Sequence, residues 1–120
     1  MEELIVRIEN TDEFFDRLQA SARQIDRGDL SPAAASLSLS SMSQLLDVLS
    51  KTRWSLLSAL REAGPSSIRA LSKLVDRDYR GVHSDVARLL DAGLIEKNET
   101  GKVFVPWSKI TAEVYLDRAA

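Results

Sequence analysis

The sequence predicts a mainly α-helical fold with a small β part. Apolar residues recur at helical spacing in five segments, several of which begin at a capping residue and end at a glycine. Short β-branched segments stand near both ends of the chain, and a glycine-containing turn joins two further extended segments. With 120 residues, of which 44% are hydrophobic, the chain suits one compact domain with its own core.

The first forty residues are expected to form a strand, a helix and a connector. Residues 3–8, ELIVRI, are β-branched and apolar, which favours a short strand. Asn10 or Thr11 can cap the helix that follows, and Glu13 places a favourable negative charge in its first turn. One face of this helix is apolar and a glycine ends it: Phe14, Leu18, Ala22, Ile25 and Gly28. The connector GDLSPAAASLSLSS follows, in which residues 37–39 favour a brief extended piece.

Two helices are expected between residues 41 and 64. Ser41 and Gln44 match the S-x-x-Q capping box, in which the hydroxyl and the amide each satisfy a backbone N–H. The second helix runs from about Thr52 to Ala63, and Gly64-Pro65 ends it because proline cannot continue a helix. The buried positions expected from helical spacing are Met42, Leu45, Leu46 and Leu49 in the first helix, and Leu56, Leu57 and Leu60 in the second.

Residues 66–93 hold two further helices joined by a tight turn. Ser66 or Ser67 caps the first, DRD makes the turn, and Asp78 stands where the cap of the second belongs. Gly93 ends the second helix. The apolar positions are Ile68, Leu71, Leu74 and Val75 in the first, and Val82, Val86, Leu89 and Leu90 in the second. This arrangement predicts a helix-turn-helix.

A hairpin and a last strand complete the expected fold. LIEK and KVFVP are short strands joined by residues 98–101, with Gly101 available for a positive φ. Three helices followed by a β-hairpin make a winged helix-turn-helix. ITAEVYL, residues 110–116, alternates in polarity and predicts a half-buried strand. We therefore divide the chain into 1–40 for dimerisation or partner contacts, 41–107 for the winged helix-turn-helix, and 108–120 for the C-terminal strand and tail.

The central segment also resembles a known family. It contains RWSLLSAL, then SIRAL, then RDYRGVHSDV, then LLDAGLI. These patterns resemble those of the MarR/ArsR-like winged helix-turn-helix regulators, and are most similar to MarR-like DNA-binding proteins that include TumA-type antitoxins. The resemblance is strong over residues 50–107. It implies double-stranded DNA as a partner and, for an antitoxin, a cognate toxin protein as well.

This sequence departs from the family pattern at three positions. Asp76 stands in the turn where glycine is usual, and aspartate tolerates the left-handed conformation better than most residues. Gly81 lies inside the second helix, which it should weaken by about 1 kcal/mol relative to alanine. Ser84 stands where relatives often carry a basic residue. These departures bear on the strength of DNA binding more than on the fold.

The net charge of −2 conceals an uneven distribution of charge along the chain. Residues 51–88 carry eight Lys and Arg against four acids, a net +4, whereas residues 1–50 carry nine acids against four arginines, a net −5. A basic middle with acidic flanks fits a protein whose central face meets an anion. Chance scatter of surface charge is the alternative.

The second helix of the helix-turn-helix is predicted to enter the major groove of DNA. At 100° per residue its apolar side chains cluster within about 60° and mark the buried side. Arg80 and Ser84 lie opposite and His83 lies on the flank, in the N-terminal half that such helices present to base edges. Arg80 is the candidate for a bidentate contact to guanine, and His83 and Ser84 are candidates at base edges. An ordinary solvated face with two arginines is the alternative.

Phosphate contacts are expected from residues around this helix. The chain after Gly64-Pro65 offers backbone N–H groups and serine hydroxyls that suit an anion. Lys97 and Lys102 flank the wing and are placed to follow the DNA backbone or reach the minor groove. The other phosphate candidates are Ser66, Ser67, Arg69, Lys73, Arg77, Tyr79 and Arg88. Tyr79 also suits a packing role, and Arg53 is equally able to pair with an acid.

Several function classes find no support in the sequence. The chain has no cysteine, and its one histidine has no adjacent carboxylate pair, so we expect no metal site, no cofactor and no enzyme. No run approaches the ~18 apolar residues of a membrane span, and the N-terminus lacks the pattern of a signal peptide, which favours a cytoplasmic protein without membrane contact. Trp54 and Trp107 are expected in the core or at an interface.

Two functional hypotheses remain. The first is a homodimeric, sequence-specific DNA-binding repressor, which as an antitoxin would regulate its own operon and neutralise a toxin. The dimer is expected to be built from the N-terminal strand and helix with the C-terminal strand, because the strands at the two ends, 3–8 and 110–116, have edges that need partners. The second is a winged-helix protein-interaction module without DNA binding. The +4 segment, Arg80 and His83 favour the first, whereas Ser84 and the overall negative charge favour the second.

Overall fold

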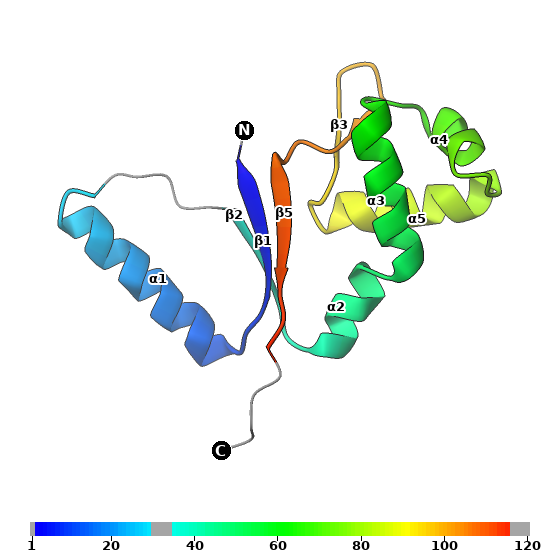
Figure 1. Ribbon diagram of the computed structural model, residues 1–120. Helices are drawn as coiled ribbons and strands as arrows, with labels where there is room; N and C mark the ends of the chain where they lie inside the picture. Colours follow the sequence, from blue (N-terminus) through cyan, green and yellow to red (C-terminus); the bar gives the residue numbers. More distant parts are fainter. Residues whose placement is uncertain (1, 30–34, 116–120) are drawn as a thin grey trace.

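The computed structural model describes residues 2–29 and 35–115. Within these ranges the chain is a mixed α/β protein with five helices, a three-stranded parallel sheet and a two-stranded hairpin. In chain order the elements are β1 (Glu3–Ile8), α1 (Thr11–Asp26), β2 (Ala35–Leu39), α2 (Met42–Val48), α3 (Lys51–Ala63), α4 (Ile68–Leu74), α5 (Tyr79–Asp91), β3 (Glu96–Lys97), β4 (Val103–Phe104) and β5 (Lys109–Glu113). Figure 1 shows the sheet in the middle, with α1 on one side and α2–α5 on the other.

The sheet joins the two ends of the sequence. Its strand order is β2-β1-β5, and β1 pairs in parallel with both neighbours. The predicted strand over residues 3–8 is confirmed, but β1 is the central strand and both of its edges are paired within the chain, so the expectation that it offers a free edge to a second copy is wrong. The extended piece expected at residues 37–39 is confirmed as part of β2. The C-terminal strand ends at Glu113, earlier than expected, with Val114 exposed and Leu116 outside the described residues.

Helix α1 begins as predicted and packs differently from the other long helices. Asn10 accepts a hydrogen bond from the Glu13 N–H at 2.8 Å, and the Glu13 carboxylate completes the capping box. The apolar face expected for this helix does not become a core face, since α1 contains no buried residue. Phe14 is half-buried, whereas Leu18 and Ile25 are exposed.

Helix α2 is capped by Ser41 and buries less than its pattern predicts. Ser41 Oγ accepts from the Gln44 N–H at 3.1 Å, but the Gln44 side chain accepts from Ser40 rather than from the cap backbone, so only half of the predicted capping box forms. Leu45 is buried, and Met42 and Leu46 are 44% and 56% exposed. The predicted four-residue buried stripe is therefore wrong at these two positions.

Helices α3, α4 and α5 follow the predicted boundaries closely. The buried face of α3 is Leu56, Leu57 and Leu60, as predicted. Ser67 caps α4, whose Leu71 is buried, but the predicted apolar position Leu74 is 57% exposed. The turn between α4 and α5 places Asp76 at φ 54°, which confirms that an aspartate adopts the left-handed conformation there.

The hairpin is shorter than predicted and is attached to the chain before α4. Its strands β3 and β4 have two residues each, and Leu94 and Ile95, which were expected to open the first strand, are buried in the core before the pairing begins. Gly101 takes the expected positive φ of 83° in the connecting turn. Ser66 forms an antiparallel bridge with Val103, with N–H to carbonyl distances of 3.0 and 2.9 Å.

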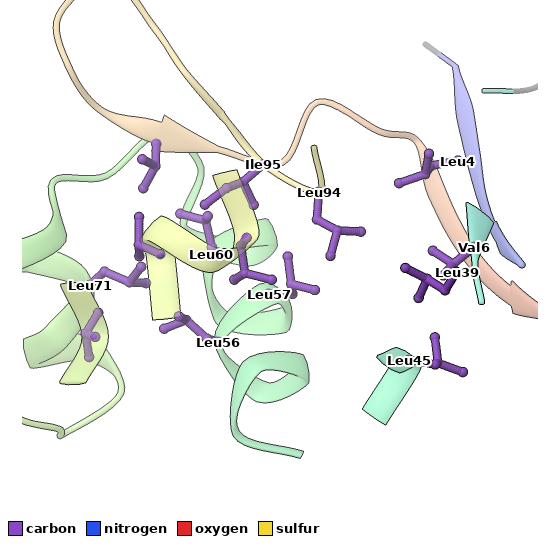
Figure 2. Packing of buried hydrophobic residues seen from close by; sticks show 14 residues of the cluster. Leu4, Val6, Leu39, Leu45, Leu56, Leu57, Leu60, Leu71, Leu94 and Ile95 are labelled. Carbon is purple, nitrogen blue, oxygen red and sulfur yellow. The ribbon is translucent and has the colours of Figure 1, made fainter. Parts of the chain in front are cut away.

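One apolar core runs from the sheet into the helices. Figure 2 shows Leu4, Val6, Leu39 and Leu45 as its sheet end, and residues of α3, α4, α5 and the hairpin as its other end. Trp54 is 44% exposed and so is not a core residue, while Trp107 is half-buried and donates from Nε1 to the Gly93 carbonyl at 3.1 Å. Among the described residues, no helix is long and apolar enough to cross a membrane.

Candidate nucleic-acid interface

Helix α5 has one fully buried side and one solvent-facing side. Asp78 caps it by accepting from the Gly81 N–H at 2.9 Å. Val82, Val86 and Leu89 are at most 1% exposed, which confirms the predicted buried side. A Cβ on residue 81 would lie 3.0 Å from the Asp78 carboxylate, so glycine leaves room for the capping side chain.

The predicted base-contacting residues all lie on the solvent side of α5. Arg80, His83 and Ser84 are exposed, and they occupy the first two turns of the helix. Tyr79 is 50% exposed, so the packing role considered for it is not seen within the chain. Its ring instead lies 5.9 Å from the His83 ring, at a tilt of 41°. The start of α5 therefore presents a cation, an imidazole, a hydroxyl and a phenol to solvent.

A buried carboxylate, Asp85, ties α5 to its neighbours. Its Oδ1 accepts from Arg53 Nε of α3 at 3.1 Å, and its Oδ2 lies 2.8 Å from Arg77 Nη1 of the α4–α5 turn. The second contact is an ion pair without hydrogen-bond alignment. Sequence reasoning missed this network, although Asp85 stands three residues after Val82 and four before Leu89, on the buried side.

Two arginines predicted to contact phosphate are engaged within the chain. Arg77 pairs with Asp85, and its side chain is 29% exposed. Arg88 pairs with Asp47 of α2 and is 45% exposed. Arg53, for which pairing with an acid was one of two predicted roles, does pair with one, Asp85. These contacts hold α2, α3 and α5 together rather than leaving the guanidinium groups free.

The remaining phosphate candidates lie on α4, before it and on the hairpin. Arg69, Lys73, Lys97 and Lys102 are exposed and basic. The Ser66 hydroxyl donates to the Gly64 carbonyl at 2.8 Å and its N–H to the Val103 carbonyl, so the N–H expected to be unpaired is engaged. Ser67 is exposed, and its hydroxyl caps α4 by accepting from the Ala70 N–H at 3.0 Å.

The hairpin turn is held by one side chain. The Asn98 Oδ1 accepts from the backbone N–H groups of Thr100 and Lys102, each at 3.0 Å, and from the Thr100 hydroxyl. Such an asparagine fixes a turn locally. With the bridge from Ser66 to Val103 at its other end, the hairpin is attached to the start of α4, and α4 packs on α5.

A second polar cluster lies at the far end of the molecule, where α1 meets the sheet. Arg17 donates to both carboxylate oxygens of Glu9, at 2.8 and 3.4 Å, and the Ser38 hydroxyl donates to the same carboxylate. The hydrogen bonds from Arg17, followed by that from Ser38, hold the pKa of Glu9 below its ordinary value.

In residues 2–29 and 35–115, no group of three or more acidic, histidine or cysteine residues is arranged to hold a metal ion.

Comparison with known proteins assigns a family to the part of the chain that contains the candidate interface. No curated protein and no solved structure matches the chain. A model of the HVO_A0114 family matches residues 48–112, which is more than half of the 120 residues and runs from the end of α2 into β5. The chain belongs to the HVO_A0114 family.

Proposed function

We propose that residues 41–107 form a winged helix-turn-helix and that the chain is a sequence-specific, DNA-binding transcriptional repressor. The observation that carries this proposal is the two-sided character of α5. Its buried side is wholly packed, while Arg80, His83 and Ser84 project into solvent from its first two turns. Recognition helices present their N-terminal residues to base edges in this way.

The elements around α5 support the same function. The α4–α5 turn, with Asp76 in the left-handed region, is short enough to set α4 against α5. The hairpin carries Lys97 and Lys102, and its bridge at Ser66 places it beside the start of α4. The +4 net charge of residues 51–88 supplies the long-range attraction for phosphates.

The proposal assigns different roles to the basic residues. Arg80 makes a bidentate contact to a guanine, for which its exposed position is suited. Arg69, Lys73, Lys97 and Lys102 contact phosphates. Arg77 and Arg88 position α5 through Asp85 and Asp47, and contribute less to phosphate binding than an unpaired arginine would.

The first test is selection of binding sites from random duplex DNA, followed by titration of the enriched duplex at several salt concentrations. We expect one enriched motif and a binding constant that falls steeply with salt. Lys102→Ala should lower affinity for all sequences and flatten the salt slope by about one unit. The matched control is Arg23→Ala, which removes an exposed cation from α1, on the other side of the sheet. A wild-type chain that enriches no motif contradicts the proposal.

A protein partner is a second candidate, and α1 is the observation that favours it. Phe15, Leu18 and Ile25 of this helix are 55%, 44% and 61% exposed. Exposed apolar side chains grouped in this way are typical of a surface that binds another protein. The toxin of an antitoxin pair would fit this surface, and the −5 net charge of residues 1–50 favours a basic one. Co-purification with the product of the adjacent gene, with and without Leu18→Glu, tests this. If wild type and the Leu18→Glu variant capture the partner equally well, α1 has no role in binding it.

A further inference from the structure

Strand β5 leaves one edge of the parallel sheet open. Within the described residues the order is β2-β1-β5, so β5 has a strand on one side only. An open edge exposes backbone N–H and C=O groups that can pair with another strand. Strand β1, the other strand expected to take part in assembly, is already paired on both sides.

The sequence of β5 is complementary to itself in the antiparallel direction. It reads KITAE, with Thr111 at its centre. If two copies lie antiparallel about a two-fold axis at Thr111, Lys109 faces Glu113 of the second copy, and Ile110 faces Ala112. Both Lys–Glu pairs form at once because the axis repeats every contact. We infer that β5 is the dimerisation strand and that its occupant is β5 of a second copy of this chain.

The neighbouring strand extends this complementarity. In the parallel register of β1 and β5, Glu3 lies beside Lys109 and Arg7 beside Glu113, with 3.9 Å between Arg7 Nε and Glu113 Oε2. Across the joined edge, four charged side chains therefore form one row on the same face of the sheet. The row runs from Glu3 and Lys109 of one copy to Glu113 and Arg7 of the second copy. Its charges alternate in sign at every step, which favours this register over one in which like charges meet.

The opposite face of β5 offers apolar surface at the same edge. Leu4 and Val6 are buried on this side of the sheet, and their partners in register are Ile110 and Ala112. Ala112 is exposed, whereas Leu4 and Val6 on the same face are buried. A cavity of about 150 Å³ adjoins this region, lined by Trp54, Leu57, Ser58, Arg61, Val105 and Ile110. A second copy would bring its own Ile110 and Ala112 to this surface.

Helix α1 is the other exposed apolar surface, and it suits self-association less well. Asp12 and Asp26 are fourteen residues apart, so they share one flank of the helix within about 40°. In an antiparallel pair of α1 helices, these two acids would meet at both ends of the contact. The alternating charges of β5 contain no such repulsion.

Charge exchange tests the pairing directly. Lys109→Glu and Glu113→Lys should each raise the dimer dissociation constant of the full chain by about tenfold, because each makes two facing pairs repulsive. An equimolar mixture of the two variants restores both pairs, and we expect it to associate nearly as tightly as wild type in sedimentation equilibrium. A loss caused by damage within each chain would not be rescued by mixing. A wild-type chain that stays monomeric overturns the inference, as does a mixture no tighter than its components.

A single cysteine locates the two-fold axis. The chain has no cysteine of its own, so a cross-link reports only the introduced thiol. Thr111→Cys should form a disulfide-linked dimer under mild oxidation, since directly opposed residues of antiparallel strands lie about 4.5–5.5 Å apart between Cα atoms. Thr100→Cys in the hairpin turn is the exposed control and should not cross-link. Cross-linking of Leu37→Cys in β2, with none at Thr111→Cys, would overturn the assignment in favour of the other sheet edge.

Discussion

Helices α1 and α5 have comparable apolar patterns and opposite surroundings. Val82, Val86 and Leu89 of α5 are at most 1% exposed, whereas Phe15 and Ile25 of α1 are 55% and 61% exposed. Helix α5 is covered because a short turn brings α4 against it, and its apolar side joins the same core as the leucines of α3. Helix α1 lies on the other side of the sheet from the other helices (Figure 1), and none of its residues is buried. An apolar stripe thus predicts a helix with a contact face, but not whether its own chain covers that face.

The largest expected difference is in packing energy, between the core that α5 shares with α3 and the exposed face of α1. Leu60→Ala removes a side chain that is 1% exposed, and the resulting cavity should lower the free energy of unfolding by about 2–5 kcal/mol. Leu18→Ala on α1 is the matched substitution at a position 44% exposed, and should change it by less than about 1 kcal/mol. Urea unfolding of both variants measures this. Equal losses would mean that α1 is as well packed as α3.

The ion-pair network should give the next largest effect. Asp85→Ala leaves Arg53 and Arg77 without their shared carboxylate, and should destabilise the fold by about 1–3 kcal/mol, since the two arginines keep partial contact with water. Asp91→Ala removes an exposed acid from the end of the same helix and is the control. The readout is the midpoint of chemical unfolding. Matching midpoints for the two variants would show that the network does not hold α5 in place.

The smallest effect concerns the attachment of α1 and depends on pH. The pKa of Glu9 is lowered in the folded chain, so its contact with Arg17 stabilises the fold above the ordinary carboxyl pKa of 4.5. This contribution is lost as the pH falls through the lower pKa of the folded state. Glu9→Gln should therefore reduce stability at neutral pH and flatten its dependence on pH in the acid range. Parallel pH profiles for the variant and wild type would contradict the role of Glu9.

Local signals in the sequence predicted the secondary structure well. Asn10, Ser41, Ser67 and Asp78 cap the helices they were expected to begin, because each capping bond is made within three residues. Asp76 adopts the left-handed conformation in the predicted turn for an equally local reason. The hairpin was placed correctly, although its strands are shorter than predicted: β3 begins only at Glu96, and β4 spans only Val103 and Phe104.

Long-range packing could not be predicted in the same way. Met42, Leu46 and Leu74 are exposed because α2 and α4 have seven residues each, and two turns of helix can direct few positions toward one core. The central place of β1 depends on pairing with strands about 30 and 105 residues away, which no local pattern specifies. At the candidate site, the exposed residues Arg80, His83 and Ser84 followed from helical periodicity alone. The partners of Arg77 and Arg88 did not, since they come from α5 and α2.

Binding of Arg80→Ala to DNA tests the central claim, that α5 reads base sequence, most directly. The variant and wild type are titrated with the selected duplex and a scrambled duplex across a salt series, with thermal unfolding as the control for folding. We predict that the variant loses about 1–3 kcal/mol on the selected duplex, loses discrimination at one base pair, and unfolds like wild type. If the variant binds each of the two duplexes as tightly as wild type does, the claim is contradicted and a protein-interaction module is favoured.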